Sequence, residues 1–342
     1  MSWLHSVAVQ QATDHNHPAN TFAARRGVLL KRINQQITTD PTVPVRRIYD
    51  AAAAQDSGDS DDIAGFENVR SRAKRFRSKL LPPIPAAIDD VHIVDSWSTT
   101  WRGTPFLSHH DTYWGVTVFT TTELLKTMQK CTCLFIDGTF RTAPRPYMQL
   151  VTVHGLHNGF VIPLVFCLAT GKTIGHYRQI IQHLKNEVRR RSHARLHPRR
   201  VVCDFEQSLL IAIQTELPTT RVSGCFFHFT QSLWRRLQEL GLAAHYRRDR
   251  RLKRFVRKVM AIAFLPVLLV RQNFRMIRIS RLVGRLCRQF PRLDDWLRYV
   301  EATYVEANST FPPPIWNVFD RNARTRTNNQ IEGNFKVYGG RD

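Results

Sequence analysis

The chain has 342 residues, of which 43% are hydrophobic and 10% aromatic, and it carries 50 Lys and Arg against 27 Asp and Glu. This composition excludes a disordered tail and supports two or three domains with a sizeable core. The formal charge of +23 predicts a polyanionic partner, either nucleic acid or an acidic membrane face, although a generally basic surface without such a partner is the alternative. The positive residues crowd into segments 186–200, 245–258 and 270–292.

Six cysteines at irregular spacing do not make a disulfide framework in a chain of this size, so reduced thiols are expected. Residues 1–20 show no signal-peptide pattern. No apolar run has the length of a membrane span, and the longest, 260–270, contains Pro266 and is expected to form a buried helix or turn. These features predict a soluble protein of a reducing compartment that binds nucleic acid and no membrane.

The first elements along the chain are predicted to be helices over residues 21–81. Apolar residues recur at helical spacing in 20–37, the stretch "TTDPTVP" ends that helix, and a second follows in "VRRIYDAAAAQ". The acidic linker "DSGDSDD" (56–62) precedes a basic helix, "FENVRSRAKRFRSKLLP". Such a helix can cross a phosphate backbone or be merely solvated, and charge alone does not separate the two. Residues 21–81 are therefore a candidate DNA-binding region.

A proline-rich linker, "LPPIPAAI" (81–88), predicts a domain boundary. Residues 82–112 are expected to hold this linker and leading strands in "VHIVDSW" (91–97) and "TPFLSHH" (104–110). Alternating apolar residues then predict a strand over 113–121, and a short helix follows in "TTELLKTMQ".

The next segments predict a mixed α/β sheet. The apolar run "CLFI" ends on Asp137, and two apolar strands, 147–156 and 161–170, are joined by Asn158–Gly159, a strong hairpin signal. A helix over 175–191 and a short strand ending on Asp204 follow. Residues 230–310 have an almost wholly helical pattern.

Asp137 and Asp204 both terminate apolar strands. The simpler interpretation of Asp137 is a turn, because Asp-Gly is a common turn dipeptide. However, strand ends on one edge of an α/β sheet form its site, and two carboxylates brought together there repel each other unless a cation lies between them. Mg²⁺ prefers such oxygen ligands, and two aspartates with a third acid, for which Glu332 is the candidate, suit two-metal phosphoryl transfer.

The stretches "FIDGTFRTAP", "QLVTVHG", "VVCDFEQSL", "GCFFHFTQSLWRRLQELGL" and "WNVFDRNARTRTNNQIEGNF" lie in order within residues 113–335. They resemble the transposases of Mutator-like elements, the MULE family. The resemblance implies a ribonuclease H-like mixed sheet over 113–342, with an all-helical insertion at about 230–315 before the last acidic residue and the small helical region in front of the domain.

By this resemblance, Asp137, Asp204 and Glu332 are a DDE triad that binds two Mg²⁺ or Mn²⁺ ions. The expected activity is metal-dependent cleavage and strand transfer on DNA, with element ends and target as partners, in the nucleus and as a homo-oligomer. One alternative is a catalytically inactive, domesticated or decayed descendant that only binds DNA. Another is an RNA-directed nuclease of similar fold.

Two His-containing stretches invite a zinc interpretation. Cys225 and His228 form half of a zinc site, but no second pair lies nearby, so a packed thiol and a histidine near the active site are the alternatives. "DHNHPAN" resembles the end of a FLYWCH or WRKY-type zinc finger, with His15 and His17 as its last ligands. The upstream cysteine pair is absent, so a remnant without zinc is expected there.

The segment after Glu332 departs from the family pattern. The family usually continues Gly-Trp-His, whereas this chain has Gly-Asn-Phe and ends at Asp342. A catalytic carboxylate must be held rigidly by its surroundings. This departure and the early end predict a shortened terminal helix and impaired strand transfer.

Overall fold

The computed structural model describes residues 21–55, 64–140 and 142–326. These residues form two compact units, one up to Ile84 and the other from Pro85 onward. The helical prediction for the first unit is confirmed: it consists of α1 (Thr21–Thr39), α2 (Val45–Ala53) and α3 (Phe66–Leu80). Their inward faces form a separate small core around Leu29, Ile33 and Ile48. Helix α1 ends where the Asp40 carboxylate accepts a 2.8 Å hydrogen bond from the Thr42 amide, which starts the predicted break.

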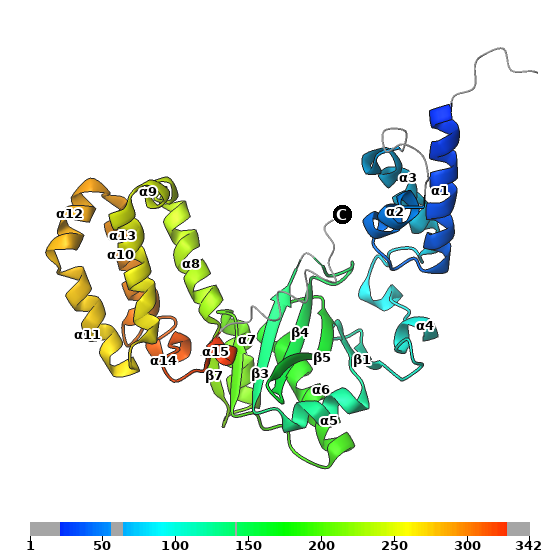
Figure 1. Ribbon diagram of the computed structural model, residues 1–342. Helices are drawn as coiled ribbons and strands as arrows, with labels where there is room; N and C mark the ends of the chain where they lie inside the picture. The colour runs from blue at the N-terminus through cyan, green and yellow to red at the C-terminus, as the bar shows by residue number, and fades with distance from the viewer. Residues whose placement is uncertain (1–20, 56–63, 141, 327–342) are drawn as a thin grey trace, which may run out of the picture. The chain divides into compact units, whose positions relative to one another are not determined.

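The second unit contains a seven-stranded mixed sheet in the order β1-β2-β5-β4-β3-β6-β7 (Figure 1). Neighbours from β1 to β3 are antiparallel, whereas β3, β6 and β7 are parallel. The strands are β1 (Leu107–Asp111), β2 (Val116–Phe119), β3 (Cys133–Thr139), β4 (Gln149–His157), β5 (Phe160–Ala169), β6 (Arg200–Cys203) and β7 (Arg221–Gly224). The mixed sheet expected for the resemblance is thereby confirmed.

The predicted hairpin is confirmed because its turn chemistry is local. Asn158 and Gly159 separate β4 from β5 and both have positive φ, 48° and 81°, as a two-residue turn of this hand requires. The parallel strands need longer connections. Helix α6 (Ile174–Ser192) links β5 to β6, and α7 (Gln207–Glu216) links β6 to β7.

The two faces of the sheet have different cores. Alternate residues of β3, such as Leu134 and Ile136, join the main core with α6, α7 and α5 (Thr122–Lys130). The residues between them, Cys133 and Phe135, belong to a smaller cluster with Val202 and Cys225 on the opposite face. The central strand β3 is therefore buried on both faces, and its residues from Cys133 to Ile136 are apolar without interruption.

A helical region follows β7 and extends the main core, as the sequence predicted (Figure 1, yellow and orange). Its longest helix, α8, begins directly after the sheet. The region consists of α8 (Phe226–Glu239), α9 (Ala243–Arg248), α10 (Arg250–Met260), a 3-10 turn (Ala261–Phe264), α11 (Val267–Arg278), α12 (Arg281–Gln289), α13 (Arg292–Val300), a π turn (Glu301–Val305), α14 (Pro313–Trp316) and α15 (Ala323–Arg326).

The predicted strand at 91–97 is wrong. Residues 91–94 are irregular, and Asp95–Ser98 form a short helix, α4, while the first strand begins only at Leu107. The alternation of apolar residues there was short, and no neighbouring strand pairs with it. Tertiary pairing, which decides whether a short apolar segment becomes a strand, is not visible in the local pattern.

Candidate active site

Asp137 lies inside β3, and not in a turn after it. Its backbone pairs with Thr152 of β4, and the strand continues through Gly138 and Thr139. The Asp137 side chain is only 8% exposed, whereas the other buried residues at this end of β3 are apolar. The turn interpretation of the Asp-Gly dipeptide is therefore wrong, and Asp137 is a buried acid at the carboxyl end of a central strand.

The register between β3 and β6 brings Asp204 to the same level. Phe135 pairs with Val202, 67 positions later, and Asp204 follows Asp137 by the same 67 positions. Asp204 comes directly after Cys203, the last residue of β6. Neighbouring strands lie about 4.8 Å apart, so both aspartates lie at the same edge of the sheet. The register thus places two of the three predicted acids at equivalent positions of adjacent strands.

Burial shapes the electrostatics of Asp204 and of a further acid, Glu206. Burial raises the pKa of Asp204, although a backbone amide of Glu206 and the ammonium of Lys172 act in the opposite direction. Burial also raises the pKa of Glu206; Tyr177 and Lys172 lower it, and the nearby Asp204 raises it further. Desolvation therefore works against two carboxylates at the end of one strand.

A buried polar network of hydrogen bonds joins α6, β4 and the β5–α6 loop near this edge. The Tyr177 hydroxyl of α6 donates a 3.1 Å hydrogen bond to Gln149 Oε1, and Gln149 Nε2 donates a 2.8 Å bond to the carbonyl of Gly171. Gln149 also lies close to β3, since a Cβ added to Gly138 would stand 3.2 Å from its Oε1 atom. The network ties the residue after Asp137 to the loop that carries Lys172.

Sequence reasoning did not single out Glu206, Lys172 or Gln149. Glu206 lies two residues beyond Asp204 in the quoted stretch "VVCDFEQSL", so a second acid next to a strand-final aspartate was an available signal. No comparable local signal marked Lys172 or Gln149, because their relation to the acids arises from contacts between β4, the β5–α6 loop and β6.

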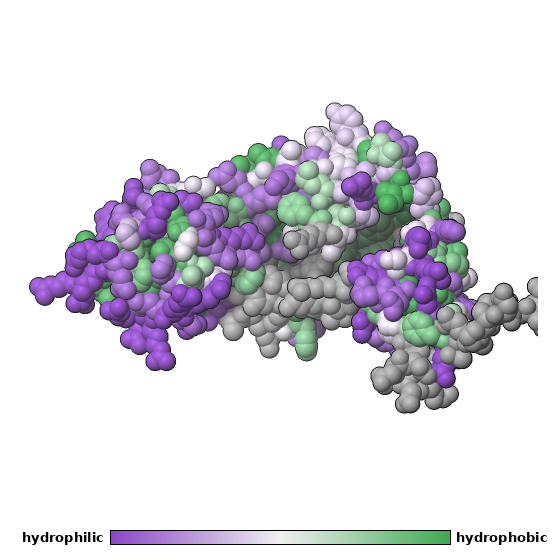
Figure 2. Space-filling view, turned by 90° about the horizontal axis from the view of Figure 1, so that it is seen from above, coloured by the Kyte–Doolittle hydropathy of each residue, from purple (hydrophilic) through white to green (hydrophobic). Residues whose placement is uncertain are grey.

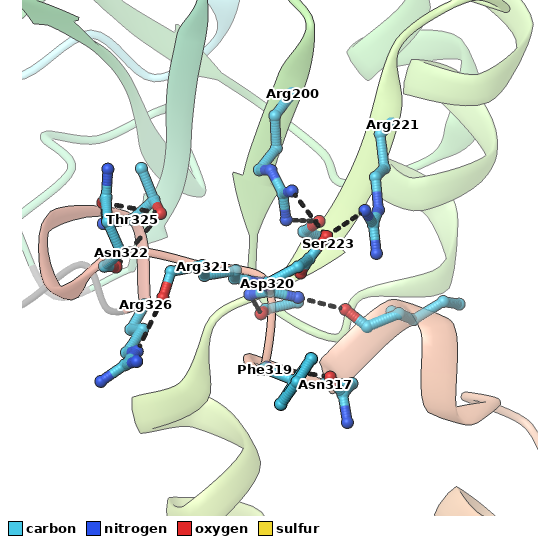
Figure 3. Close-up of polar contacts among 12 residues, drawn as sticks. Arg200, Arg221, Ser223, Asn317, Phe319, Asp320, Arg321, Asn322, Thr325 and Arg326 are labelled. Carbon is cyan, nitrogen blue, oxygen red and sulfur yellow. Dashed lines mark hydrogen bonds and ion pairs between the residues drawn. The ribbon is translucent and has the colours of Figure 1, made fainter. Parts of the chain in front are cut away.

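The segment after α14 is fixed to the edge strand of the sheet (Figure 3). The buried Arg321 guanidinium donates 2.7 Å hydrogen bonds to the carbonyls of Gly224 and Ile315. The neighbouring Asp320 carboxylate forms ion pairs with Arg200 and Arg221 at the beginnings of β6 and β7. Burial lowers the pKa of Arg321 to about 10, and the guanidinium remains a cation at neutral pH. The segment around Asp320 and Arg321 is therefore anchored to β7 and to the beginning of β6.

Of the remaining predicted site residues, Cys225 packs with Phe135 and Val202 and donates its backbone amide to the carbonyl of Cys203, the residue before Asp204. Glu332, His15 and His17 lie outside the described ranges, and their roles stay predictions. Cys225 is buried directly before α8, and His228 is the third residue of that helix. In the part of the chain that the structure describes, no three His, Cys, Asp or Glu side chains group as a metal site.

Helices α9 and α10 carry the second charged feature of this unit. Every exposed position from 247 to 258 is Arg or Lys, while Leu252, Phe255, Val256 and Val259 of α10 face the core. The exposed cations are Arg247, Arg248, Arg250, Arg251, Arg254, Arg257 and Lys258. Among the described residues only Arg251 has an acidic partner, Asp249 at 3.4 Å. In Figure 2 hydrophilic side chains dominate the surface of the helical region, on the left of the view. We call these seven side chains the α9–α10 basic stripe.

None of the helices within the described ranges is both long and apolar enough to cross a membrane. A comparison with curated proteins finds no match. A comparison with protein families matches the strands and helices that carry both aspartates, from the beginning of β3 to the first half of α8. Over residues 133–232 the chain matches the MULE transposase domain.

Proposed function

We propose that this chain is a MULE-type transposase domain that cleaves DNA with the help of divalent cations. The observation that carries the proposal is the pair Asp137 and Asp204. They stand at equivalent positions on adjacent parallel strands, and both lie within the matched segment. A fold that needed these strands only for its core would have no use for two carboxylates at the same buried edge, because burial disfavours their charged forms.

The donor set fits Mg²⁺ or Mn²⁺. Two carboxylates at one edge of the sheet offer the hard oxygen ligands that these ions prefer, and bound cations would relieve the desolvation that raises the pKa of Asp204. Asp137 and Asp204 would hold the ions, with Glu332 as the third proposed ligand. Bound there, divalent cations supply activation of the attacking oxygen and stabilisation of the leaving one.

DNA is the proposed substrate, and the nucleus is the proposed location. The α9–α10 basic stripe offers seven exposed cations, of which Arg251 alone is paired with an acid among the described residues, and this suits a phosphate backbone. The anchored segment at Arg321 supports a third acid from the C-terminal side, because its hydrogen bond to Gly224 fixes the chain at the carboxyl end of β7, the neighbour of β6, shortly before residue 332.

The experiment is cleavage of labelled double-stranded DNA with Mg²⁺ or Mn²⁺. It compares the wild-type chain with Asp137→Ala, Asp204→Ala and Glu332→Ala. Glu123→Gln, an exposed acid on α5, is the matched control. We expect each of the first three variants to lose about a thousandfold in cleavage rate at unchanged DNA affinity, since several kcal/mol of transition-state stabilisation depend on the metals. DNA binding without metal-dependent cleavage by any form would contradict the enzyme and favour the inactive DNA-binding descendant.

A further inference from the structure

The carboxyl edge of the sheet exposes large apolar side chains next to the two acids. Phe140 directly follows β3 and is 47% exposed, and Met148 directly precedes β4 and is 48% exposed. Tyr113, in the turn before β2, is 89% exposed. Thr139 pairs with Leu150, and Ala169 pairs with both Gln149 and Val116, so the three side chains belong to the same edge in strand order.

A lysine stands beside these side chains. Lys172, in the loop between β5 and α6, is exposed, and its Nζ atom lies 5.4 Å from the centroid of the Phe140 ring. The same ammonium acts on the carboxylates of Asp204 and Glu206, whose pKa values it lowers. The position of its loop is fixed by a hydrogen bond, because Gln149 donates to the carbonyl of Gly171, the residue before Lys172.

We propose that Lys172, Phe140, Met148 and Tyr113 form a binding surface for a single nucleic-acid strand that leads into the Asp137–Asp204 edge. This inference rests on the proposed function, because it assigns a substrate form to the same site. Unpaired bases stack on exposed aromatic rings, and a lysine ammonium binds the phosphate between them. Along the edge, neighbouring strands from β6 to β2 lie about 4.8 Å apart. The surface is therefore elongated across several strands, as binding of an extended nucleic-acid strand requires.

A duplex does not suit this edge. In a duplex the faces of the bases are already stacked, and only the phosphate backbone would meet Phe140 and Tyr113. Phosphates placed against the apolar rings and next to buried carboxylates would lose water, and on this surface only a phosphate that reaches Lys172 would gain a partner. The α9–α10 basic stripe has the opposite character, with cations and no exposed aromatic side chain between residues 247 and 258. We therefore assign duplex backbone to the stripe and the separated strand to the sheet edge.

The simpler role for Lys172 is that of a counter-ion for Asp204 and Glu206. In that case its contact with Phe140 is incidental, and removal of the Phe140 ring would leave strand binding unchanged. The two roles can therefore be separated by substituting the ring and the ammonium independently.

The test measures binding of fluorescently labelled single-stranded and duplex oligodeoxynucleotides to the full chain in EDTA, where no cleavage interferes. The variants are Phe140→Ala, Phe140→Trp, Lys172→Gln and Lys172→Arg. Phe160→Ala is the matched control for the ring, since Phe160 is 72% exposed at the opposite end of the strands, beside the β4–β5 turn. Lys130→Gln at the end of α5 is the control for the charge.

We expect Phe140→Ala to weaken single-strand binding by about five- to 150-fold, the range of one stacked base, with duplex binding unchanged. Phe140→Trp and Lys172→Arg should retain binding, and both controls should match the wild type. If Phe140→Ala and Lys172→Gln bind single strands as the wild type does, or weaken both forms of DNA equally, the inference is wrong.

Cleavage distinguishes this failure from failure of the proposed function. If the chain cleaves DNA with Mn²⁺ but its Phe140 and Lys172 variants keep the wild-type KM, the proposed function is supported and the inferred binding surface is wrong. If the chain never cleaves DNA but binds single strands through Phe140, the proposed enzyme activity is wrong and the binding surface is supported.

Discussion

At the carboxyl edge of the sheet the charged side chains include acids that the fold partly or wholly buries, whereas on α9 and α10 they are cations that stand in solvent. The acids are disfavoured by desolvation, which raises the pKa of Asp204 and of Glu206. The cations repel one another, and among the described residues Asp249 alone pairs with one of them. Neither arrangement stabilises the folded chain, and both become favourable only with a ligand of opposite charge.

The arginines of α11 and α13 differ from those of the stripe. Arg271 and Arg275 of α11 pair with Glu306, and Arg298 of α13 pairs with Asp294 and Asp295. Basic composition alone therefore does not define a binding surface. The helical region therefore holds arginines compensated by acids, on α11 and α13, and arginines without an acidic partner among the described residues, in the stripe and at Arg281, Arg285 and Arg288 of α12.

The largest effect is expected from the core that joins the helical region together. Trp316 is fully buried, stacks on Phe229 at 4.6 Å, and donates to the carbonyls of Tyr304 and Phe311. Trp316→Ala should lower the free energy of unfolding by about 3–5 kcal/mol in chemical denaturation. The control Trp101→Ala, at a side chain that is 89% exposed, should change it by less than about 0.5 kcal/mol. Equal effects would show that the described packing is wrong.

The second prediction compares how the arginines of the stripe and the acid-paired arginines of α11 and α13 contribute to the salt dependence of DNA binding. A triple substitution of Arg250, Arg254 and Arg257 by Gln should reduce the slope of log affinity against log salt for duplex DNA by about 2.7, because each phosphate that is no longer neutralised lowers it by about 0.9. The matched triple substitution of Arg271, Arg275 and Arg298 removes the same formal charge from paired side chains. It should change the slope by less than about 1. Similar slopes in both triple variants would assign DNA binding to net charge and not to the stripe.

The smallest effect is a gain in stability at the acidic edge. Asp204→Asn should raise the free energy of unfolding by about 0.5–2 kcal/mol at neutral pH in EDTA, as substitution of a strained functional residue commonly does. The measurement is thermal unfolding. Adding Mg²⁺ should raise the Tm of the wild type more than that of Asp204→Asn, because only the wild type keeps both carboxylates. Equal Mg²⁺ responses would argue against a metal site here.

The same variant has a defined pH dependence. The pKa of Asp204 in the folded chain is raised above its ordinary value of 3.8, so the folded state binds this proton more tightly than the unfolded state. The wild type should therefore lose stability relative to Asp204→Asn as pH rises from about 3.8 through the raised pKa. Below that window the two proteins should unfold alike, whereas an advantage of the variant that grew toward acid pH would contradict burial as the cause.

The sequence predicted those parts of the molecule that are specified locally. The β4–β5 hairpin followed from Asn158–Gly159, and the helices followed from their apolar spacing. The strand-final positions of Asp137 and Asp204 were visible as the ends of two apolar runs. That they share one level of the sheet was an expectation from fold rules, and it depends on a register that no local pattern encodes.

The parts that were missed arise from contacts between distant segments. Arg321 reaches Gly224, 97 positions earlier, and nothing around Arg321 marks it as buried. Lys172 follows β5 and Phe140 follows β3, and both strands pair with β4. Their contact therefore depends on the order of the strands in the sheet. At 91–97 the error was of the opposite kind, since a local alternation predicted a strand for which the fold supplies no partner.

The parallel pairing of β3 with β6 has a consequence for how the molecule reaches its native state. The β4–β5 hairpin is closed by a two-residue turn, whereas the β3–β6 ladder joins residues 67 positions apart. Helix α6 lies between these two strands in the sequence. Loop closure of that length is entropically costly, so long-range pairing of this kind is slow. During synthesis Asp137 leaves the ribosome well before Asp204, and the two carboxylates meet only after β6 has been made. We therefore expect the acidic edge to be assembled late in folding, and substitutions that slow the docking of α6 should delay its formation even where they leave the finished structure intact.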